Sequence, residues 1–402
     1  MTQPTDQNSS ATDQNGERPP LGVSVANKLG AAVSSKSTQT RAPAMGLGGK
    51  ITSLFGGPGS WRNTIAGLIV LAVVARIVLV GLQEQDINLA AVAFMYSTVA
   101  TGIALLYYYG GLLSIAHGGL WGIGAYFAAI LAMRHGWSML PILVVAAIGC
   151  AIGATLLASI SIRVVGSYFL IILFAVSEVI YGVMNTWTGL TAGAEGIVVT
   201  AKASLFGFKL DSNEHWYEAT VVTLIIVLLV VQAVKRSRIG QRLKAIRDNR
   251  DLAVSVGVNV VSTHMIAFAI TGAIAAVGGV YWGYFEGYVV PSQYSPTASI
   301  DFVLVVLLGG SAYLLGPTLG AIVLIFLPSV LHLSPLLGDA VIGAIFIAVI
   351  LLSPSGLAGI FEQSFHWFLR KLSGGGTSAA DLEERLETGL AADAVSRELG
   401  DV

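Results

Sequence analysis

Charged residues are scarce in this sequence. Asp, Glu, Lys and Arg make up 11% of its 402 residues, against roughly 25% in a typical soluble domain. Hydrophobic residues make up 54%, and the mean hydropathy is +0.76. A chain this apolar is incompatible with an ordinary cytosolic enzyme, a secreted disulfide scaffold or a disordered protein. We therefore expect an all-α, polytopic integral membrane protein.

Several chemical signatures are also missing. The single cysteine, Cys150, excludes an internal disulfide, and a net charge of −1 gives no reason to expect nucleic-acid binding. The chain has no G-x-x-x-x-G-K-[ST] phosphate loop, so it cannot hydrolyse ATP by that route. It shows no metal-ligand cluster or nucleophile–base pair. We expect no enzyme activity and no cofactor in this chain.

The few charges are unevenly placed. Eight lie in residues 1–60, nine in 235–251 and eleven in 370–402. This distribution predicts a disordered N-terminal tail over 1–60, a transmembrane domain over 61–372 and an acidic tail over 373–402. We expect no secretory signal peptide before the first apolar segment, and we expect that segment to act as the insertion signal.

Apolar segments follow one another through the transmembrane domain. A helix needs about 20 residues to cross a bilayer, and eight to ten crossings are expected from ten candidates. The eighth and ninth candidates are short and interrupted by Gly and Pro, as in segments that line a cavity. The candidates are 64–82, 89–109, 111–133, 139–162, 168–186, 217–234, 264–285, 300–315, 317–333 and 337–352.

Lys and Arg predict the orientation. The 235–263 loop carries seven basic residues, and Arg370 and Lys371 follow the last span. Basic loops stay on the cytoplasmic side. We therefore expect a protein of the plasma (inner) cell membrane, with both termini on the cytoplasmic side and the 187–216 loop on the outer side. The run Tyr107–Tyr109 then reads as an aromatic belt at the inner interface.

The basic loop has a helical pattern. Leu243, Ile246 and Arg247 recur at i, i+3 and i+4 between Gly240 and Gly257. This favours a short helix lying across the membrane face. Such a helix could dock on a soluble partner, or it could anchor the loop to lipid headgroups; the pattern alone leaves both open.

Six ordered stretches in 85–360 carry a family resemblance. The chain resembles the LivM-type permeases of branched-chain amino acid ABC transporters. The stretches are S-I-A-H-G-G (114–119) with G-I-G-A-Y (122–126), G-S-Y-F (166–169) with E-V-I (178–180), N-T-W-T-G-L-T (185–191) with E-G-I (195–197), G-Q-R-L-K-A-I-R-D (240–248), L-G-P (315–317) and G-A (320–321).

The chain departs from the family pattern in places. Ala116 and Ala192 stand where the family favours Gly, Ser167 replaces Asp, and Ser355 replaces Arg. Tyr313 closes a turn that the family builds from small residues. These changes leave urea or short amides open as substrates beside Leu, Ile and Val. An ion-coupled secondary transporter is a further alternative, but it predicts more intramembrane carboxylates and inverted repeats.

The resemblance implies a transport subunit in a larger assembly. It implies two ABC ATPase subunits on the cytoplasmic face, which bind ATP and Mg²⁺, and an extracytoplasmic substrate-binding protein. It also implies a second permease chain in the bilayer, either another copy or a LivH-type paralogue. The residues expected to couple to the ATPase are Gly240, Arg242, Leu243, Ala245, Ile246, Arg247, Asp248 and Gly257.

A second set of residues is expected along the substrate path. It comprises Ser114, His117, Gly118, Gly119, Tyr126, Glu178, Asn185 and Thr191. His117 could donate into the path or be a hydrogen-bonded core histidine. The glycines could form an unwound turn that holds a zwitterion, or simply allow close helix packing. Asn185 and Thr191 could form an outer gate or a plain helix terminus.

Glu178 and Arg76 are read as the two deep charges. An ionised side chain at the middle of a span costs at least about 2.5 kcal/mol. Glu178 is therefore expected to face the protein interior or to be neutral. In the interior it could contact a substrate ammonium or pair with Arg76. Arg76 could instead extend toward the nearer interface.

Overall fold

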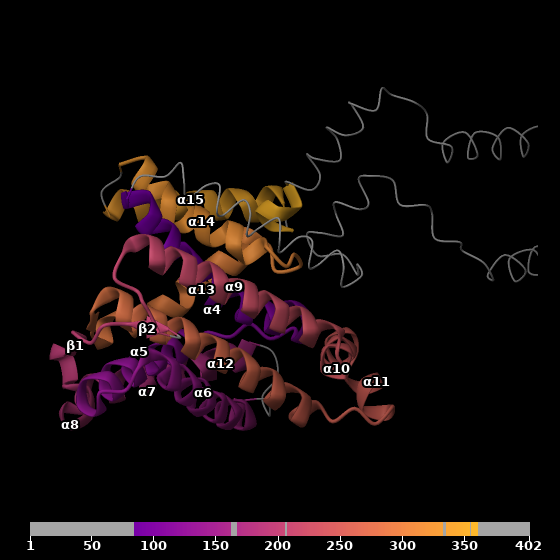
Figure 1. The fold of residues 1–402 in the computed structure, drawn as a ribbon. Helices are drawn as coiled ribbons and strands as arrows, with labels where there is room; N and C mark the ends of the chain where they lie inside the picture. Colours follow the sequence, from indigo (N-terminus) through magenta and orange to yellow (C-terminus); the bar gives the residue numbers. More distant parts are fainter. Residues whose placement is uncertain (1–83, 162–166, 206, 333–334, 354, 361–402) are drawn as a thin grey trace, which may run out of the picture. The chain divides into compact units, whose positions relative to one another are not determined.

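The computed structural model describes residues 84–161, 167–205, 207–332, 335–353 and 355–360 (Figure 1). The predicted tails over 1–60 and 373–402, the first candidate span over 64–82 and Arg76 lie outside the described residues.

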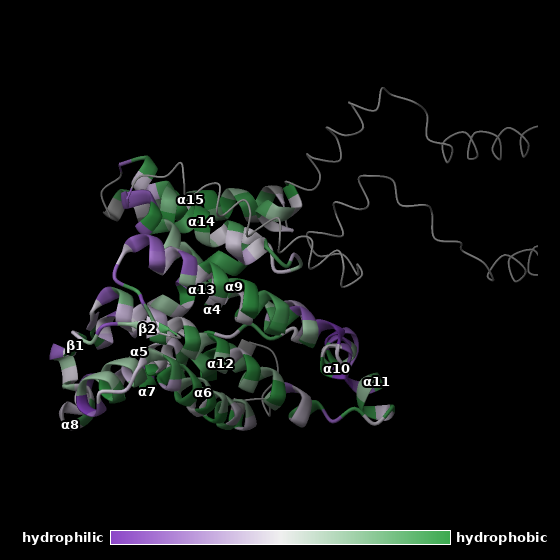
Figure 2. Ribbon diagram, viewed as in Figure 1, coloured by the Kyte–Doolittle hydropathy of each residue, from purple (hydrophilic) through white to green (hydrophobic). Residues whose placement is uncertain are grey.

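Five helices are long and apolar enough to cross a membrane. Their lengths match the roughly 20 residues that a bilayer requires, and Figure 2 shows them as largely hydrophobic ribbons. They confirm the expected all-α polytopic architecture. The five are α4 (Glu84–Gly110), α6 (Met139–Ser161), α7 (Ser167–Thr186), α9 (Asn213–Arg236) and α12 (Val260–Glu286).

A further helix, α5 (His117–His135), begins later than predicted. The sequence reading placed a span at 111–133, but residues 111–116 have no regular secondary structure. Gly111 follows the end of α4 with φ +67°, a left-handed conformation that glycine adopts without strain. An irregular connection therefore leads from α4 to the first turn of α5.

The predicted broken segments are present near the end of the chain. Helix α13 (Pro296–Gly309) has 14 residues and α14 (Gly316–Val330) has 15, fewer than a full crossing needs. Helix α15 (Pro335–Leu352) follows. Because α13 begins at Pro296 rather than at the predicted residue 300, Asp301 lies inside a helix rather than at its edge.

Helices α12 and α4 are at the centre of the packing. Helix α12 packs against α6, α5 and α4, while α4 also packs against α9, α14 and α13. Small residues allow the closest approaches: a Cβ on Gly279 of α12 would overlap the Trp121 carbonyl of α5, and one on Gly124 would overlap the Ala276 carbonyl. Glycine at these points therefore sets the spacing of α5 and α12.

The loops divide between two ends of the helices. At one end, called here the basic end, α10 (Arg238–Asp248) and α11 (Arg250–Ser255) connect α9 to α12; α10 is the hydrophilic segment at the ends of these helices in Figure 2. The opposite end holds α8 (Thr188–Thr191), η1 (Gly193–Glu195), β1 (Ile197–Val198), β2 (Ser204–Leu205), β3 (Phe208–Lys209), β4 (Tyr288–Val289) and η2 (Pro291–Tyr294).

Short antiparallel strand pairs join these loops. Strand β1 pairs with β4 in the register Ile197↔Val289 and Val198↔Tyr288, and β2 pairs with β3. The β1–β4 pair connects the segment after α7 to the segment after α12. Thus the ends of two helices that are distant in sequence are held together at the opposite end.

Candidate functional site

The junction of α9 and α10 fixes where the basic helix begins. Ser237 lies between the two helices; its Oγ donates to the Val234 carbonyl at 2.8 Å and accepts from the backbone of Ile239 at 3.2 Å. A Cβ at Gly240 would overlap the Val234 and Lys235 carbonyl oxygens. The turn therefore needs glycine at position 240, and α10 is tied directly to the end of α9.

One face of α10 is buried against the transmembrane helices. Leu243 is fully buried and belongs to the main core, and its Cδ2 would lie 3.6 Å from a Cβ on Gly110 at the end of α4. Ile246 packs in a small cluster with Ala253 and Val260. Helix α10 is thus the short helix that the sequence pattern predicted, and its apolar side contacts the protein.

Arg247 attaches α10 to α4. Its Nη1 donates a hydrogen bond to the Tyr108 carbonyl, and its guanidinium carbon lies 4.9 Å from the centre of the Tyr108 ring. Lys235 lies over the next ring, 5.4 Å from the centroid of Tyr109. Cation–π contacts contribute about 0.5–1 kcal/mol even when exposed. Two of the three tyrosines that were predicted to form an aromatic belt, Tyr108 and Tyr109, therefore contact basic side chains. The sequence signal for these contacts was a run of three tyrosines at the end of a span, on the same side of the membrane as the basic loop.

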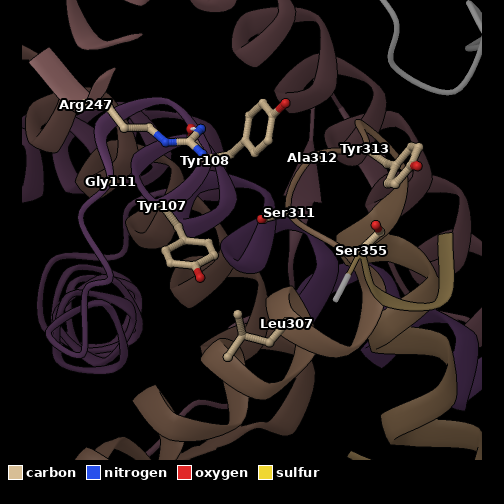
Figure 3. A pocket seen from close by; sticks show the side chains of 10 residues that line it. Tyr107, Tyr108, Gly111, Arg247, Leu307, Ser311, Ala312, Tyr313 and Ser355 are labelled. Atoms are coloured by element: carbon tan, nitrogen blue, oxygen red, sulfur yellow. Dashed lines mark hydrogen bonds between the residues drawn. The ribbon is translucent and has the colours of Figure 1, made fainter. Parts of the chain in front are cut away.

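A pocket of about 460 Å³ lies beside this attachment (Figure 3). It brings together the end of α4, helix α10, the turn between α13 and α14, and Ser355 after α15. Figure 3 shows the Arg247 side chain extending toward Tyr108. The lining residues are Tyr107, Tyr108, Gly111, Arg247, Leu307, Gly310, Ser311, Ala312, Tyr313 and Ser355.

The remaining predicted coupling residues are mostly exposed. Arg242, Ala245 and Asp248 are on the outer side of α10, and Gly257 follows α11 with φ +85°. Helix α11 and the residue after it add exposed apolar side chains: Leu252 is 62% exposed and Val256 72%. These apolar residues were missed, although the run L-A-V-S-V-G-V signalled them. We call the exposed set Arg242, Ala245, Leu252, Val254 and Val256 the docking face.

His117 is fully buried and bonded at both ring nitrogens. Its Nδ1 lies 2.8 Å from the Ser114 Oγ, and its Nε2 lies 3.1 Å from the Thr271 Oγ1 of α12. The structure therefore gives the core-histidine reading a geometric basis, with Ser114 as part of the same group. An imidazole held in this way fixes the start of α5 against the middle of α12.

The glycines near His117 are in helix α5, not in an unwound turn. The Gly118 N–H donates to the Ser299 Oγ of α13 at 2.9 Å. A Cβ on Gly119 would lie 3.1 Å from Ile180 of α7, and one on Gly122 would lie 2.6 Å from Tyr294. The irregular backbone precedes them, at residues 111–116. Because these glycines have no side chains, α13, α7 and η2 can pack closely against α5.

The outer candidates have different surroundings. The Thr191 Oγ1 donates to the Met184 and Trp187 carbonyls, both at 2.7 Å, so Thr191 closes the end of α7. Asn185 is half-buried on the last turn of α7. The Tyr126 hydroxyl is buried and has no hydrogen-bond partner within the described residues.

Glu178 does not face the interior of this chain. It is exposed on α7, near the middle of the helix, and the described part of the chain gives it no hydrogen bond or ion pair. The expectation that Glu178 turns inward is therefore wrong for the single chain. The buried side of α7 instead carries Phe169, Leu173 and Ser177.

The fold and these contacts define a class: a multi-pass helical membrane protein with broken helices and a basic helix pair at one end. A family model described as "branched-chain amino acid transport system, permease component" matches residues 86–350. The chain belongs to this family of transport permeases, which makes it a transport subunit rather than an enzyme.

Individual relatives agree with the family. The chain is 25% identical to the high-affinity branched-chain amino acid transport system permease protein LivM of Escherichia coli K12, over 73% of this chain and 74% of the relative. It is 26% identical to the LivH permease protein of Salmonella typhimurium, over 69% and 95%, and 26% identical to the BraD permease protein of Pseudomonas aeruginosa, over 60% and 83%. No solved structure is significantly similar to the chain.

Proposed function

We propose that this chain is the membrane-spanning subunit of an ATP-driven importer that translocates Leu, Ile and Val. In this proposal a binding protein delivers the amino acids on the outer side of the plasma (inner) membrane. Both termini and α10 are cytoplasmic, and ATP and Mg²⁺ are bound by two separate ABC ATPase subunits. The names of the relatives support the substrate class.

The observation that carries the proposal is the two-sided character of α10 and α11. One side is fastened to the membrane helices through Leu243 and Arg247. The other side, the docking face, is exposed and combines Arg242 with apolar residues such as Leu252 and Val256. Exposed apolar patches with a polar surround are typical of protein interaction sites.

The proposed mechanism follows from these attachments. An ATPase that binds the docking face and closes on ATP displaces α10. Because Ser237 joins α10 to α9 and Arg247 joins it to α4, the displacement reaches both helices. Helix α4 packs against α12, α13 and α14, so its movement rearranges the helices around the His117 region.

The test is a charge placed on the docking face. In proteoliposomes containing the whole transporter, we expect Leu252→Asp with Val256→Asp to abolish ATPase binding and leucine uptake, because a carboxylate opposes an apolar interface. Phe208→Asp is the matched control, since Phe208 is 77% exposed at the opposite end. Unchanged ATPase binding and uptake in the double variant would refute the proposed coupling.

The substrate is tested in the same vesicles. We expect unlabelled isoleucine and valine to compete with radiolabelled leucine, and urea or acetamide not to compete. Competition by urea or acetamide alone would move the chain to the amide-transporting alternative.

A further inference from the structure

The pocket beside Arg247 carries a positive charge that no acidic group in its lining balances. Arg247 is the one charged residue among the described residues that line the pocket, and its polar neighbours there are tyrosines and serines. A guanidinium has five N–H donors, and the described part of the chain gives Arg247 one hydrogen bond, to the Tyr108 carbonyl. The remaining donors leave Arg247 able to bind an anion without displacing an acidic partner.

Hydroxyl groups surround the same hollow. Tyr107, Ser311 and Ser355 line the pocket, and the described residues give their hydroxyls no hydrogen bond. In Figure 3 Ser311 lies between Arg247 and Ser355. A hydroxyl donates readily to the oxygen of an anion, so these groups add neutral donors to the charge of Arg247. The pocket therefore suits an anion with several oxygen atoms, such as a phosphate group.

Close backbone packing forms the walls of this pocket. A Cβ on Gly111 would lie 3.2 Å from the Cγ of Arg247, so the glycine leaves room for the arginine stem. Gly310 has φ +100°, and a Cβ there would overlap the Ser355 carbonyl oxygen. Helix α10, the turn between α13 and α14 and the segment after α15 therefore meet at one place. A ligand held between Arg247 and Ser355 contacts all three.

The ends of α4 and α13 also lie at this pocket, and the carboxyl end of a helix disfavours an anion. Two contacts reduce this effect. Arg247 binds the Tyr108 carbonyl near the end of α4, and the Gly310 N–H donates to the Val306 carbonyl of α13 at 3.0 Å. Seven Lys and Arg residues against one Asp in residues 235–250 add positive charge at the same end. The field at the pocket therefore favours an anion.

The pocket lies at the depth of lipid headgroups. Helix α4 has 27 residues, so at about 1.5 Å per residue it is about 40 Å long, longer than the roughly 30 Å hydrocarbon core. Tyr107 and Tyr108 are in its last turn, and tyrosine is typical of the membrane interface. Leu307 adds an aliphatic wall on the α13 side. Basic pockets between helices at this depth are typical of sites for anionic lipid headgroups.

We propose that this pocket binds the phosphate group of an anionic phospholipid from the adjacent leaflet, with Arg247 as the cation and Ser311 and Ser355 as hydroxyl donors. The bound phosphate joins α10 to the turn between α13 and α14, so the lipid becomes part of the attachment of the basic helix. Arg247 is not part of the docking face, so the lipid and the proposed ATPase use different surfaces. A soluble phosphate ester offers the same chemistry, and the experiment separates the two sources.

The experiment is native mass spectrometry of the purified full-length chain in detergent. The chain is titrated with short-chain phosphatidylglycerol, with phosphatidylcholine of the same chain length, and with glycerol 3-phosphate. We expect phosphatidylglycerol to bind about fivefold more tightly than phosphatidylcholine, because one basic residue near an anionic headgroup contributes about this factor. Equal affinity for the two lipids would overturn the proposal. Displacement of the lipid by an equal concentration of glycerol 3-phosphate would support the phosphate site but overturn its assignment to a lipid.

Variants separate the pocket from general attraction to a basic surface. We expect Arg247→Gln and Ser311→Leu each to weaken phosphatidylglycerol binding about fivefold, the first by removing the cation and the second by filling the pocket while the charge stays. Ser311→Leu keeps the test decisive if Arg247→Gln does not fold. Arg242→Gln is the matched control, because Arg242 is exposed on the same helix and does not line the pocket. Unchanged binding in the pocket variants, or an equal loss in Arg242→Gln, would overturn the proposal.

Discussion

At the scale of single residues, His117 shows how a polar side chain is accommodated among apolar helices. A buried polar atom without a partner is costly, and both ring nitrogens of His117 have one, from Ser114 and Thr271. The three side chains come from the irregular segment before α5, from α5 itself and from α12. They therefore fix the first turn of α5 at a defined height along α12.

We expect Thr271→Val to destabilise the protein by about 1–3 kcal/mol, because the substitution leaves a buried imidazole nitrogen unpaired. The measurement is thermal unfolding of the purified protein in detergent. Thr155→Val is the control, since the Thr155 hydroxyl donates only within α6, to the Ala151 carbonyl. Equal losses in the two variants would show that the His117–Thr271 bond contributes nothing specific.

Ala192 stands at a position where the backbone conformation favours glycine. It has φ +62° and is one of two non-glycine residues with positive φ in the described chain. Such a conformation costs a residue with a Cβ about 1 kcal/mol or more, whereas glycine adopts it freely. The family's glycine at this position suits the turn that follows α8, and this chain makes the same turn with strain.

At the scale of elements, the short helices α10 and α11 depend on capping and on glycine more than on length. Ser237, Asn249 and Asn259 cap α10, α11 and α12 in turn, each accepting backbone hydrogen bonds through its side-chain oxygen. Caps of this type contribute about 1 kcal/mol each. They define three helix starts within the basic loop and so position the docking face.

Gly240→Ala should disconnect α10 from α9. The added methyl would overlap two carbonyl oxygens, so α10 must shift away from the end of α4. We expect at least a fivefold loss of leucine uptake per ATP hydrolysed in reconstituted vesicles, with the protein still inserted in the membrane. Gly153→Ala on α6 is the control, because a Cβ there meets nothing within 4 Å; a Gly240→Ala variant with normal coupling would contradict the prediction.

At the scale of the whole molecule, the sparse charge argues for an external energy source. Ion-coupled transporters concentrate ionisable groups within the membrane. Here the middle of the five long described helices holds one carboxylate, Glu178, and it is on the outer surface of the chain. The basic end, by contrast, presents the exposed residues on which the ATPase docks in the proposed function.

We therefore expect uptake by the reconstituted transporter to stop when ATP is withheld and to continue when a protonophore collapses the proton gradient. Leucine accumulation is measured in two preparations of vesicles, one with ATP inside and one with ATP outside. The comparison gives the rate of ATP-dependent uptake and shows on which side of the membrane the ATPase lies. Collapse of uptake by the protonophore at saturating ATP would favour ion coupling instead.

Much of the site could be anticipated from local pattern, and the failures have clear causes. The i, i+3, i+4 pattern found α10, and Gly and Pro marked the breaks around α13 and α14. The start of α13 was read four residues late, at residue 300 instead of Pro296. Glu178 was assigned to the interior because hydropathy gives depth in the membrane but not the direction in which a residue faces.

Sequence alone determined the all-α membrane class, the positions of the five long described helices, the basic helix and the family, since these depend on composition and on neighbours along the chain. Tertiary structure decided which groups meet: His117 with Thr271, Arg247 with Tyr108, and Gly118 with Ser299. It also decided that Glu178 faces outward. These contacts join residues far apart in the chain, and only the packing of α4, α5, α12 and α13 fixes their distances.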